Sequence, residues 1–505
     1  MSPGPNLNFS IPNTYTVYGT MSASSGKYYW EAVATSSPIG VGIKQLNVLD
    51  RYSNTIYYMG SSLSGTGEKY VNGTGSAYGA SWTTGDVIGV AVDMDGGTVT
   101  FYKNNTSQGS IALSLATITE FVPTFVSGAG ATFVGYVNFG QRPFSYTPPS
   151  GYVALNTYNL PTPTILQGNK YMDATLWTGD QAARTITNSG GFQPDMVWTK
   201  SRSDAESHRL SDSVRGGNGT VLYELNSNLT EAEGTDTLVS GFASNGFTIA
   251  AGTNTPNISS RTYVGWQWQA GQGSTSSNTS GSITSTVSVN TTAGFSIVTY
   301  TGTGSVATVG HGLGVAPKMM IIKCRSAAGD NWRVYHASLG ATKFLDLNQT
   351  SAVGTATSVW NDTAPTSTVW TVGTNGEVNR STSTYVGYIW AEISGFSKFG
   401  SYTGNGSADG PFVYTGFRPK FILLKSTTTA GSNWWIYDTA RSTFNAADSL
   451  LFPNLSNAEY SGGVELDILS NGFKFRNFSN DGNKSGDTFI YAAFAENPLK
   501  YSLGR

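Results

Sequence analysis

Short runs in which apolar and polar residues alternate extend along most of the chain, broken by Gly, Asn, Asp and Ser. In Gly26–Ala32 and Thr98–Asn105, large side chains alternate with polar ones, as in a half-buried strand. Tyr, Trp, Phe, Val and Thr, which favour strands, recur in these runs. We find no convincing helical period over ten or more residues. The pattern predicts an all-β chain.

Two of these runs predict a hairpin near the N-terminus. Trp82–Asp93 and Thr98–Asn105 flank Met94–Gly97, whose Asp-Gly and Gly-Gly pairs tolerate the positive φ of a tight turn. A further short apolar run, Ile39–Ile43, is thinned by glycines, which indicates close approach of another backbone. We expect residues 1–150 to form one β-sandwich.

The order of motifs in this region resembles the SPRY (B30.2-like) domain. The motifs are, in sequence order, G-x-Y-Y-W-E, I-G-V-G, W-x-x-G-D-x-I-G-V-A-x-D, F-Y-x-N, F-V-P-x-F and Y-V-N-F-G-Q. The resemblance implies a bent β-sandwich that binds partners through its loops and has no catalytic activity. Because those loops vary within the family, it implies no particular ligand. The following stretch, Phe139–Pro161, resembles the linker after SPRY domains in phage structural proteins.

The rest of the chain contains three similar segments. Each has Gly-x-x-Pro, an apolar strand and then a lysine, in Gly191–Lys200, Gly314–Lys323 and Gly416–Lys425. Each closes with a second strand at nearly the same distance, beginning at Thr262, Thr384 and Thr488. We therefore expect three β-sandwich copies, each with its own core: copy one (168–273), copy two (291–394) and copy three (395–505). Residues 151–167 would be a linker, and residues 274–290, rich in Ser and Thr, a flexible connector.

The amino-acid composition argues against several classes of function. Charged residues make up 12% of the 505 residues, against about 25% in an average domain. The net charge is −2 and the basic residues are scattered, which argues against nucleic-acid binding. No segment approaches the ~20 apolar residues of a membrane span, and Phe9–Val17 lacks the features of a signal peptide. The single cysteine, Cys324, can form neither an internal disulfide nor a metal cluster.

The chain has three histidines, His208, His311 and His336. When the three copies are aligned, His208 of copy one occupies the position of Trp332 in copy two and Trp434 in copy three. The third histidine stands where the others have Asp212 and Asp438, and the second lies in a Gly-rich turn. We interpret all three as structural. The G-x-S-x-G, H-E-x-x-H, C-x-x-C and P-loop motifs are absent, so we expect no catalytic residues and no cofactor.

Two acidic features of the sequence are candidate sites. Glu392 and Glu496 follow the closing strands of copies two and three, and glycan cleavage needs two such carboxylates about 5–10 Å apart. Each lacks a local acidic mate, so we interpret them as solvent-facing strand ends. Asp93–Gly97 and Asn480–Asn483 with Asp487 suggest calcium loops, but the first lacks the further oxygen ligands and the bidentate Glu of an EF-type loop. Turn chemistry accounts for both segments. We expect no metal, with a weak calcium site open at the second.

Recurring lysines and tryptophans are the last candidates. Lys200, Lys323 and Lys425 would snorkel at strand ends and discourage edge pairing, with contact to an anionic partner as the alternative. Trp332, Trp434 and Trp435 would pack in cores, with stacking on sugars as the alternative. Trp435, which aligns with Arg333, would be the most exposed.

The domain string resembles tail and appendage proteins of bacteriophages. It implies a non-enzymatic virion protein on the phage tail or particle surface, most simply a tail fibre or appendage for host adhesion. Its partners would be other virion proteins, a host receptor or glycan, and further copies of itself. Capsid decoration or a head fibre, a tailspike polysaccharide depolymerase and, more remotely, an intracellular SPRY adaptor remain open as alternatives.

Overall fold

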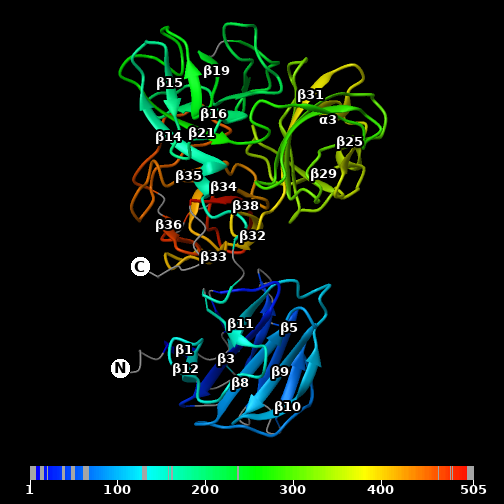
Figure 1. Cartoon of the computed structure of the whole chain (residues 1–505), viewed down its shortest axis with the longest axis vertical. Helices are drawn as coiled ribbons and strands as arrows, with labels where there is room; N and C mark the ends of the chain where they lie inside the picture. The colour runs from blue at the N-terminus through cyan, green and yellow to red at the C-terminus, as the bar shows by residue number, and fades with distance from the viewer. Residues whose placement is uncertain are drawn as a thin grey trace. The chain divides into compact units, whose positions relative to one another are not determined.

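The structure is a computed structural model, and it describes residues 7–11, 16–19, 21–36, 40–46, 52–60, 67–127, 133–156, 158–160, 163–235, 238–463, 466–477, 479 and 481–496. Contacts divide the chain into two compact units between Thr162 and Pro163. Figure 1 shows that strands dominate both units, as the all-β expectation requires. Among the described residues, no helix is long and apolar enough to cross a membrane.

The first unit is a sandwich of two antiparallel sheets. One has the order β1-β12-β3-β8-β9-β10, with β13 beside β3: β1 Leu7–Ile11, β3 Lys27–Ala34, β8 Val87–Asp93, β9 Thr98–Lys103, β10 Thr106–Ala112, β12 Phe133–Asn138 and β13 Val153–Ala154. The other has the order β2-β11-β4-β5-β6-β7: β2 Thr16–Tyr18, β4 Gly40–Gln45, β5 Thr55–Met59, β6 Glu68–Val71, β7 Thr74–Ala77 and β11 Phe121–Val126. The core between the sheets includes Trp30, Tyr58, Trp82, Phe101 and Phe121.

Two local predictions for this unit are confirmed. Strands β8 and β9 pair from Asp93 with Thr98 onward, and Gly97 in the turn between them has φ +63°. A Cβ on Gly42 would lie 1.9 Å from the carbonyl oxygen of Ile56 on β5, so only glycine allows this approach. Ile39, at the start of that run, lies outside the described residues.

In copy one the main sheet has the order β14-β21-β16-β17-β18: β14 Met172–Thr178, β16 Met196–Ser201, β17 Arg209–Asp212, β18 Leu225–Asn226 and β21 Thr262–Trp268. Its small sheet has the order β15-β20-β19: β15 Arg184–Thr187, β19 Val239–Ala243 and β20 Gly246–Ile249. A 3-10 turn, η1 Gly168–Lys170, precedes them.

In copy two the main sheet has the order β22-β23-β24-β31-β26-β27-β28-β29: β22 Ser276–Asn278, β23 Ser285–Asn290, β24 Phe295–Thr301, β26 Met319–Cys324, β27 Arg333–His336, β28 Lys343–Asp346, β29 Gly354–Thr355 and β31 Thr384–Trp390. The small sheet pairs β25 Ala307–Gly310 with β30 Val369–Val372. Two four-residue helices, α2 Thr357–Trp360 and α3 Gly376–Asn379, complete this copy.

In copy three the main sheet has the order β32-β38-β34-β35: β32 Ser397–Thr403, β34 Pro419–Ser426, β35 Trp435–Asp438 and β38 Thr488–Ala495. The small sheet has the order β33-β37-β36: β33 Phe412–Tyr414, β36 Leu466–Leu469 and β37 Gly472–Phe475. The order β32-β38-β34-β35 repeats β14-β21-β16-β17 and β24-β31-β26-β27, so the three main sheets share one topology.

Both faces of each main sheet are buried. In β21 the side chains of Val264, Trp266 and Trp268 point to one face, and Tyr263 points to the other. The first face joins a single hydrophobic cluster that contains residues from all three copies. Figure 1 shows the three lobes of the second unit gathered around that centre. Because successive side chains of a strand alternate between faces, double burial produces nearly continuous apolar runs.

The structure changes three expectations about organisation. Copies one and two each contain a hydrophobic cluster of their own, but the largest cluster is shared among all three copies, so the cores are only partly separate. Residues 274–290 are no flexible connector, since β22 and β23 extend the main sheet of copy two. Part of the expected 151–167 linker belongs to the first unit, because β13 pairs with β3 and Leu155 is fully buried in that core. Ser and Thr on an edge strand and in a linker look alike in sequence.

Candidate functional site

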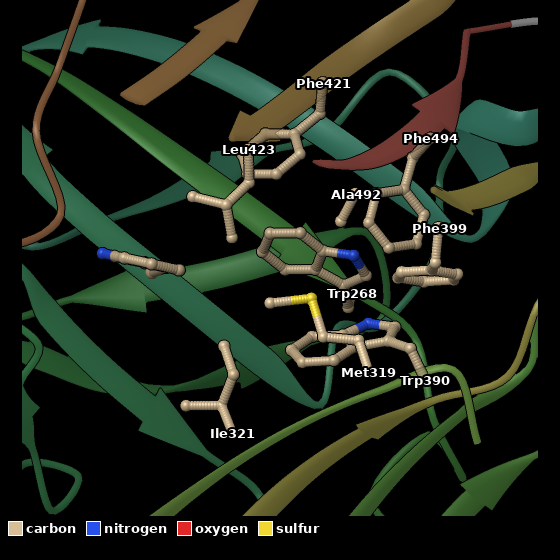
Figure 2. Close-up of a pocket in the computed structure, with 10 residues that line it drawn as sticks. Trp268, Met319, Ile321, Trp390, Phe399, Phe421, Leu423, Ala492 and Phe494 are labelled. Atoms are coloured by element: carbon tan, nitrogen blue, oxygen red, sulfur yellow. The ribbon is translucent and has the colours of Figure 1, made fainter. Parts of the chain in front are cut away.

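The centre of the second unit is an aromatic cluster. Figure 2 shows Trp268 and Trp390 lying against each other, with Phe399, Phe421 and Phe494 beside them. The lining side chains, which come from all three copies, are Trp198, Trp268, Met319, Ile321, Trp390, Phe399, Phe421, Leu423, Ala492 and Phe494. The cavity between them measures ≈ 10 Å³, whereas small-molecule pockets need about 300 Å³ or more. This centre therefore acts as packing and not as a pocket for an organic ligand.

The tryptophans singled out by their spacing are all buried. Trp332 is 0%, Trp434 is 1% and Trp435 is 2% exposed, so the expectation of an exposed Trp435 is wrong. The first two also join copies: Trp332 Nε1 donates to the carbonyl of Asn226, and Trp434 Nε1 to that of Asp346. Stacking on sugars is not available to these rings in the folded chain.

The three recurring lysines are fully buried, so both expectations for them, snorkelling and contact with an anionic partner, are wrong. Lys200 Nζ donates to the carbonyls of Ser201 and Asp204, at 2.6 and 3.1 Å. Lys323 Nζ donates to Asp330 and, across the boundary between copies, to Thr230 of copy one. Lys425 Nζ donates to the carbonyl of Ser426. The lysines lie on β16, β26 and β34, which are interior strands of their sheets, and not at edges.

Burial lowers the pKa of each of these lysines from 10.5 to about 8. Above pH 8 the unfolded chain then holds more lysine protons than the folded chain, so we expect stability to rise with pH. The gain from pH 8 to pH 9.5 should be about 1–2 kcal/mol per lysine. Above about pH 10, unfolded tyrosines ionise while buried ones resist, and the gain reverses. Urea midpoints of the second unit measure this, and Lys323→Met should remove roughly a third of the rise.

The three copies meet in a closed ring, with one backbone hydrogen bond repeated at each interface. We name each interface by the two copies that form it. Glu233 N of copy one donates to Arg325 O of copy two at interface 1–2. Val353 N donates to Thr427 O at interface 2–3. Glu459 N donates to Arg202 O at interface 3–1. The lengths are 2.8, 3.0 and 2.8 Å. Head-to-tail contacts that close after three steps have the geometry of a cyclic trimer, here within one chain.

Interface 1–2 contains a buried ionic network. Arg325 pairs with Glu233 at 2.8 Å, and Glu233 pairs with Arg215 at 3.1 Å. Arg215 also pairs with Asp212, and both side chains are 0% exposed. Tyr388 Oη of copy two donates to Asp212 Oδ2 at 2.8 Å. Each charge therefore has an opposite charge beside it, as burial requires.

Interface 3–1 repeats that network with equivalent residues. Arg202 pairs with Glu459 at 2.7 Å, Glu459 with Arg441 at 3.2 Å, and Arg441 with Asp438 at 2.6 Å. Trp266 Nε1 of copy one donates to Asp438 Oδ2 at 2.9 Å. The sequence contains a signal for both networks that apolar periodicity does not reveal. Asp-x-x-Arg recurs at 212 and 438, and in both copies a glutamate follows the arginine after 18 residues.

Interface 2–3 lacks this network. His336 replaces the aspartate, and its Nε2 lies 3.2 Å from the carbonyl oxygen of Tyr491 in copy three. Its Nδ1 accepts from Ser338 N, so the neutral ring carries its proton on Nε2. Burial lowers its pKa from 6.5 to about 4. The structural role expected for this histidine agrees with its position.

The other two histidines are also fully buried. His208 Nδ1 accepts from Trp198 Nε1 at 3.0 Å, and its ring stacks on Trp266. Burial lowers its pKa well below 6.5, and Lys200 and Arg441 lower it further. His311 lies inside copy two, where its Nδ1 accepts from Leu313 N.

The two glutamates considered for glycan cleavage do not face water alone. Glu392 pairs with Lys398 at 3.3 Å and accepts from Phe399 N. Glu496 pairs with Arg418. The side chains of Glu392 and Glu496 are 26% and 35% exposed, so both strand ends still reach solvent while a basic side chain holds each carboxylate.

The acidic turns act as turn caps. Asp93 accepts from Gly96 N at 2.7 Å and pairs with Lys27 at 2.8 Å. Asp487 accepts from Thr429 Oγ1, and Asn483 Nδ2 donates to the carbonyl of Ser407 at 2.8 Å. Asn480 lies outside the described residues. Within the described part of the chain, no three acidic, His or Cys side chains come together as a metal site.

Family models match both parts of the chain. A family model described as Domain of unknown function (DUF7483) matches residues 167–498, and the SPRY domain model matches residues 27–142. The second match confirms the SPRY resemblance of the N-terminal unit. The first spans all three copies as one family unit, in agreement with their shared core.

Two curated relatives each match about a quarter of this chain. ATP-dependent RNA helicase Ddx1 of Drosophila melanogaster is 32% identical over 134 residues, which cover 25% of this chain and 17% of that protein. Ran-binding protein 9 of Homo sapiens is 31% identical over 137 residues, again 25% of this chain and 17% of that protein. The chain thus spans less than a quarter of the length of these relatives. The solved SPRY domain of human HERC1 is 17% identical, covering 28% of this chain and 91% of that one, with a TM-score of 0.24.

Proposed function

The chain belongs to the family described as Domain of unknown function (DUF7483), and we propose that it is a non-enzymatic structural protein of a bacteriophage particle that binds the host surface. The observation that carries this proposal is the joining of a SPRY domain to a three-copy domain with one shared core. The first supplies variable loops for binding, as its family resemblance implies. The second supplies a rigid body that holds those loops on a particle.

The groups that could perform chemistry support a structural interpretation. The fully buried carboxylates Asp212 and Asp438 neutralise Arg215 and Arg441 next to the interfaces between copies. Glu392 and Glu496, the best candidates for glycan cleavage, are paired with basic side chains. Each of these carboxylates is bound by its basic partner, whereas glycan cleavage needs two carboxylates that face one substrate about 5–10 Å apart.

Three experiments test the proposal and separate it from its alternatives. Mass spectrometry of purified phage particles should detect this chain in fixed stoichiometry with other virion proteins, and its absence from the particles contradicts the proposal. Gold-labelled antibodies then distinguish tail from head, and so a tail fibre from capsid decoration. Incubation with host capsule or lipopolysaccharide should release no new reducing ends. Release of such ends identifies a depolymerase instead.

A further inference from the structure

Two of the three histidines lie at interfaces, and both of these interfaces belong to copy three. His336 of copy two contacts copy three at interface 2–3 through the carbonyl of Tyr491 and, at 6.5 Å between rings, Phe399. His208 of copy one lies at interface 3–1, where Ser227 N donates to its carbonyl and Ser227 Oγ donates to Pro453 O of copy three. Interface 1–2 has the same arginine–carboxylate network as interface 3–1, but none of the three histidines lies there.

The surroundings of both imidazoles disfavour a positive charge. Burial is the main cause that lowers both pKa values; Lys200 and Arg441 lower that of His208 further, and Lys318 that of His336. One carbonyl of copy three, Phe452 at His208 and Tyr491 at His336, opposes the shift. Of the carboxylates nearby, Asp438 is held by Arg441 and by Trp266 Nε1, so its charge is already balanced. A proton taken up by either ring thus adds to existing positive charge in a buried interface.

We infer that acid separates copy three from copies one and two: protonation of His208 and His336 opens interfaces 3–1 and 2–3 and leaves interface 1–2 closed. Opening transfers each imidazole to water, where it binds a proton more readily, so the open form takes up protons as pH falls below about 6.5. Release would expose apolar faces that include Trp266, Trp268 and Phe421, a surface that the neutral form keeps covered. This inference goes beyond the proposed function and does not depend on it.

The direction and size of the pH effect on the opening equilibrium follow from the pKa of the histidine in the closed and open states. The pKa of His336 is about 4 when closed and about 6.5 in water, so the open state gains protons between these values. Between pH 7 and pH 4.5 the opening equilibrium of interface 2–3 should rise by about two orders of magnitude. His208 shifts in the same direction at interface 3–1.

Five backbone amides that donate across interfaces report opening directly. Val353 and Gly431 donate across interface 2–3, and Glu459 across interface 3–1. Glu233 and Gly329 donate across interface 1–2 and serve as the internal reference. Hydrogen exchange on the full chain at residue resolution, corrected for the intrinsic rate, should show the first three opening at pH 4.5 and the reference pair still protected.

Variants separate the inference from general acid unfolding. In His208→Asn/His336→Asn, the amide oxygen can still accept the bonds made by Nδ1, but the side chain does not titrate. We expect this variant to stay closed at pH 4.5. His311→Asn, the matched control at a buried histidine inside copy two, should open like the parent. Equal protection of all five amides at both pH values, or their joint loss in the parent chain, overturns the inference without any variant.

Discussion

Replacing Asp438 by Asn should lower the free energy of unfolding of the second unit by about 3–5 kcal/mol. The carboxylate of Asp438 and the side chain of Arg441 are both 0% exposed, and they pair at 2.6 Å. Asp438 also accepts from the backbone N of Arg441 at 2.8 Å and from Trp266 Nε1 of copy one. The substitution leaves a buried guanidinium with only Glu459, at 3.2 Å, to balance it. Urea denaturation followed by circular dichroism measures the loss.

Two companions make this prediction specific. Asp409→Asn removes an ion pair with Lys474 whose carboxylate is 85% exposed, and should leave the urea midpoint unchanged. The double change Asp438→Leu with Arg441→Met removes both buried charges, and should recover much of the lost stability. If Asp438→Asn unfolds at the same urea concentration as the parent, the ion pair does not hold interface 3–1.

The second large effect is expected from Trp268→Ala at the centre of the second unit. Its ring contacts Trp390 of copy two at 6.2 Å and Phe421 of copy three at 5.3 Å, measured between centroids. Removing such a buried ring costs about 3–5 kcal/mol, because the cavity collapses only in part. Since the cluster is shared, all three copies should lose protection against hydrogen exchange at the same urea concentration, in the parent and the variant alike.

Trp177→Ala is the matched control. Trp177 is half-buried and packs within copy one on Phe247 and Tyr263. Its removal should cost less than the loss of Trp268, because the ring is already partly exposed to solvent. Separate unfolding of the three copies in the Trp268→Ala variant, with copies two and three as stable as before, would show that their cores are independent after all.

The sequence determined the strands and their repetition. Alternating runs such as Thr98–Asn105 and the Asp-Gly-Gly turn before it were sufficient to predict a hairpin, because period and turn chemistry are local properties. The recurrence of Gly-x-x-Pro before an apolar strand predicted three copies, and the three main sheets share one strand order. The SPRY resemblance required only the order of motifs along one segment.

The tertiary structure alone decided where those strands meet. Lys323 ends an apolar strand in sequence, which resembles an exposed edge, yet the adjacent copy covers it and supplies the carbonyl of Thr230. Trp435 is buried although its counterpart is Arg333. The partner of a side chain across a copy boundary lies up to a few hundred residues away, as Arg202 and Glu459 do. Local pattern records which face of a strand is apolar, but not which neighbour covers it.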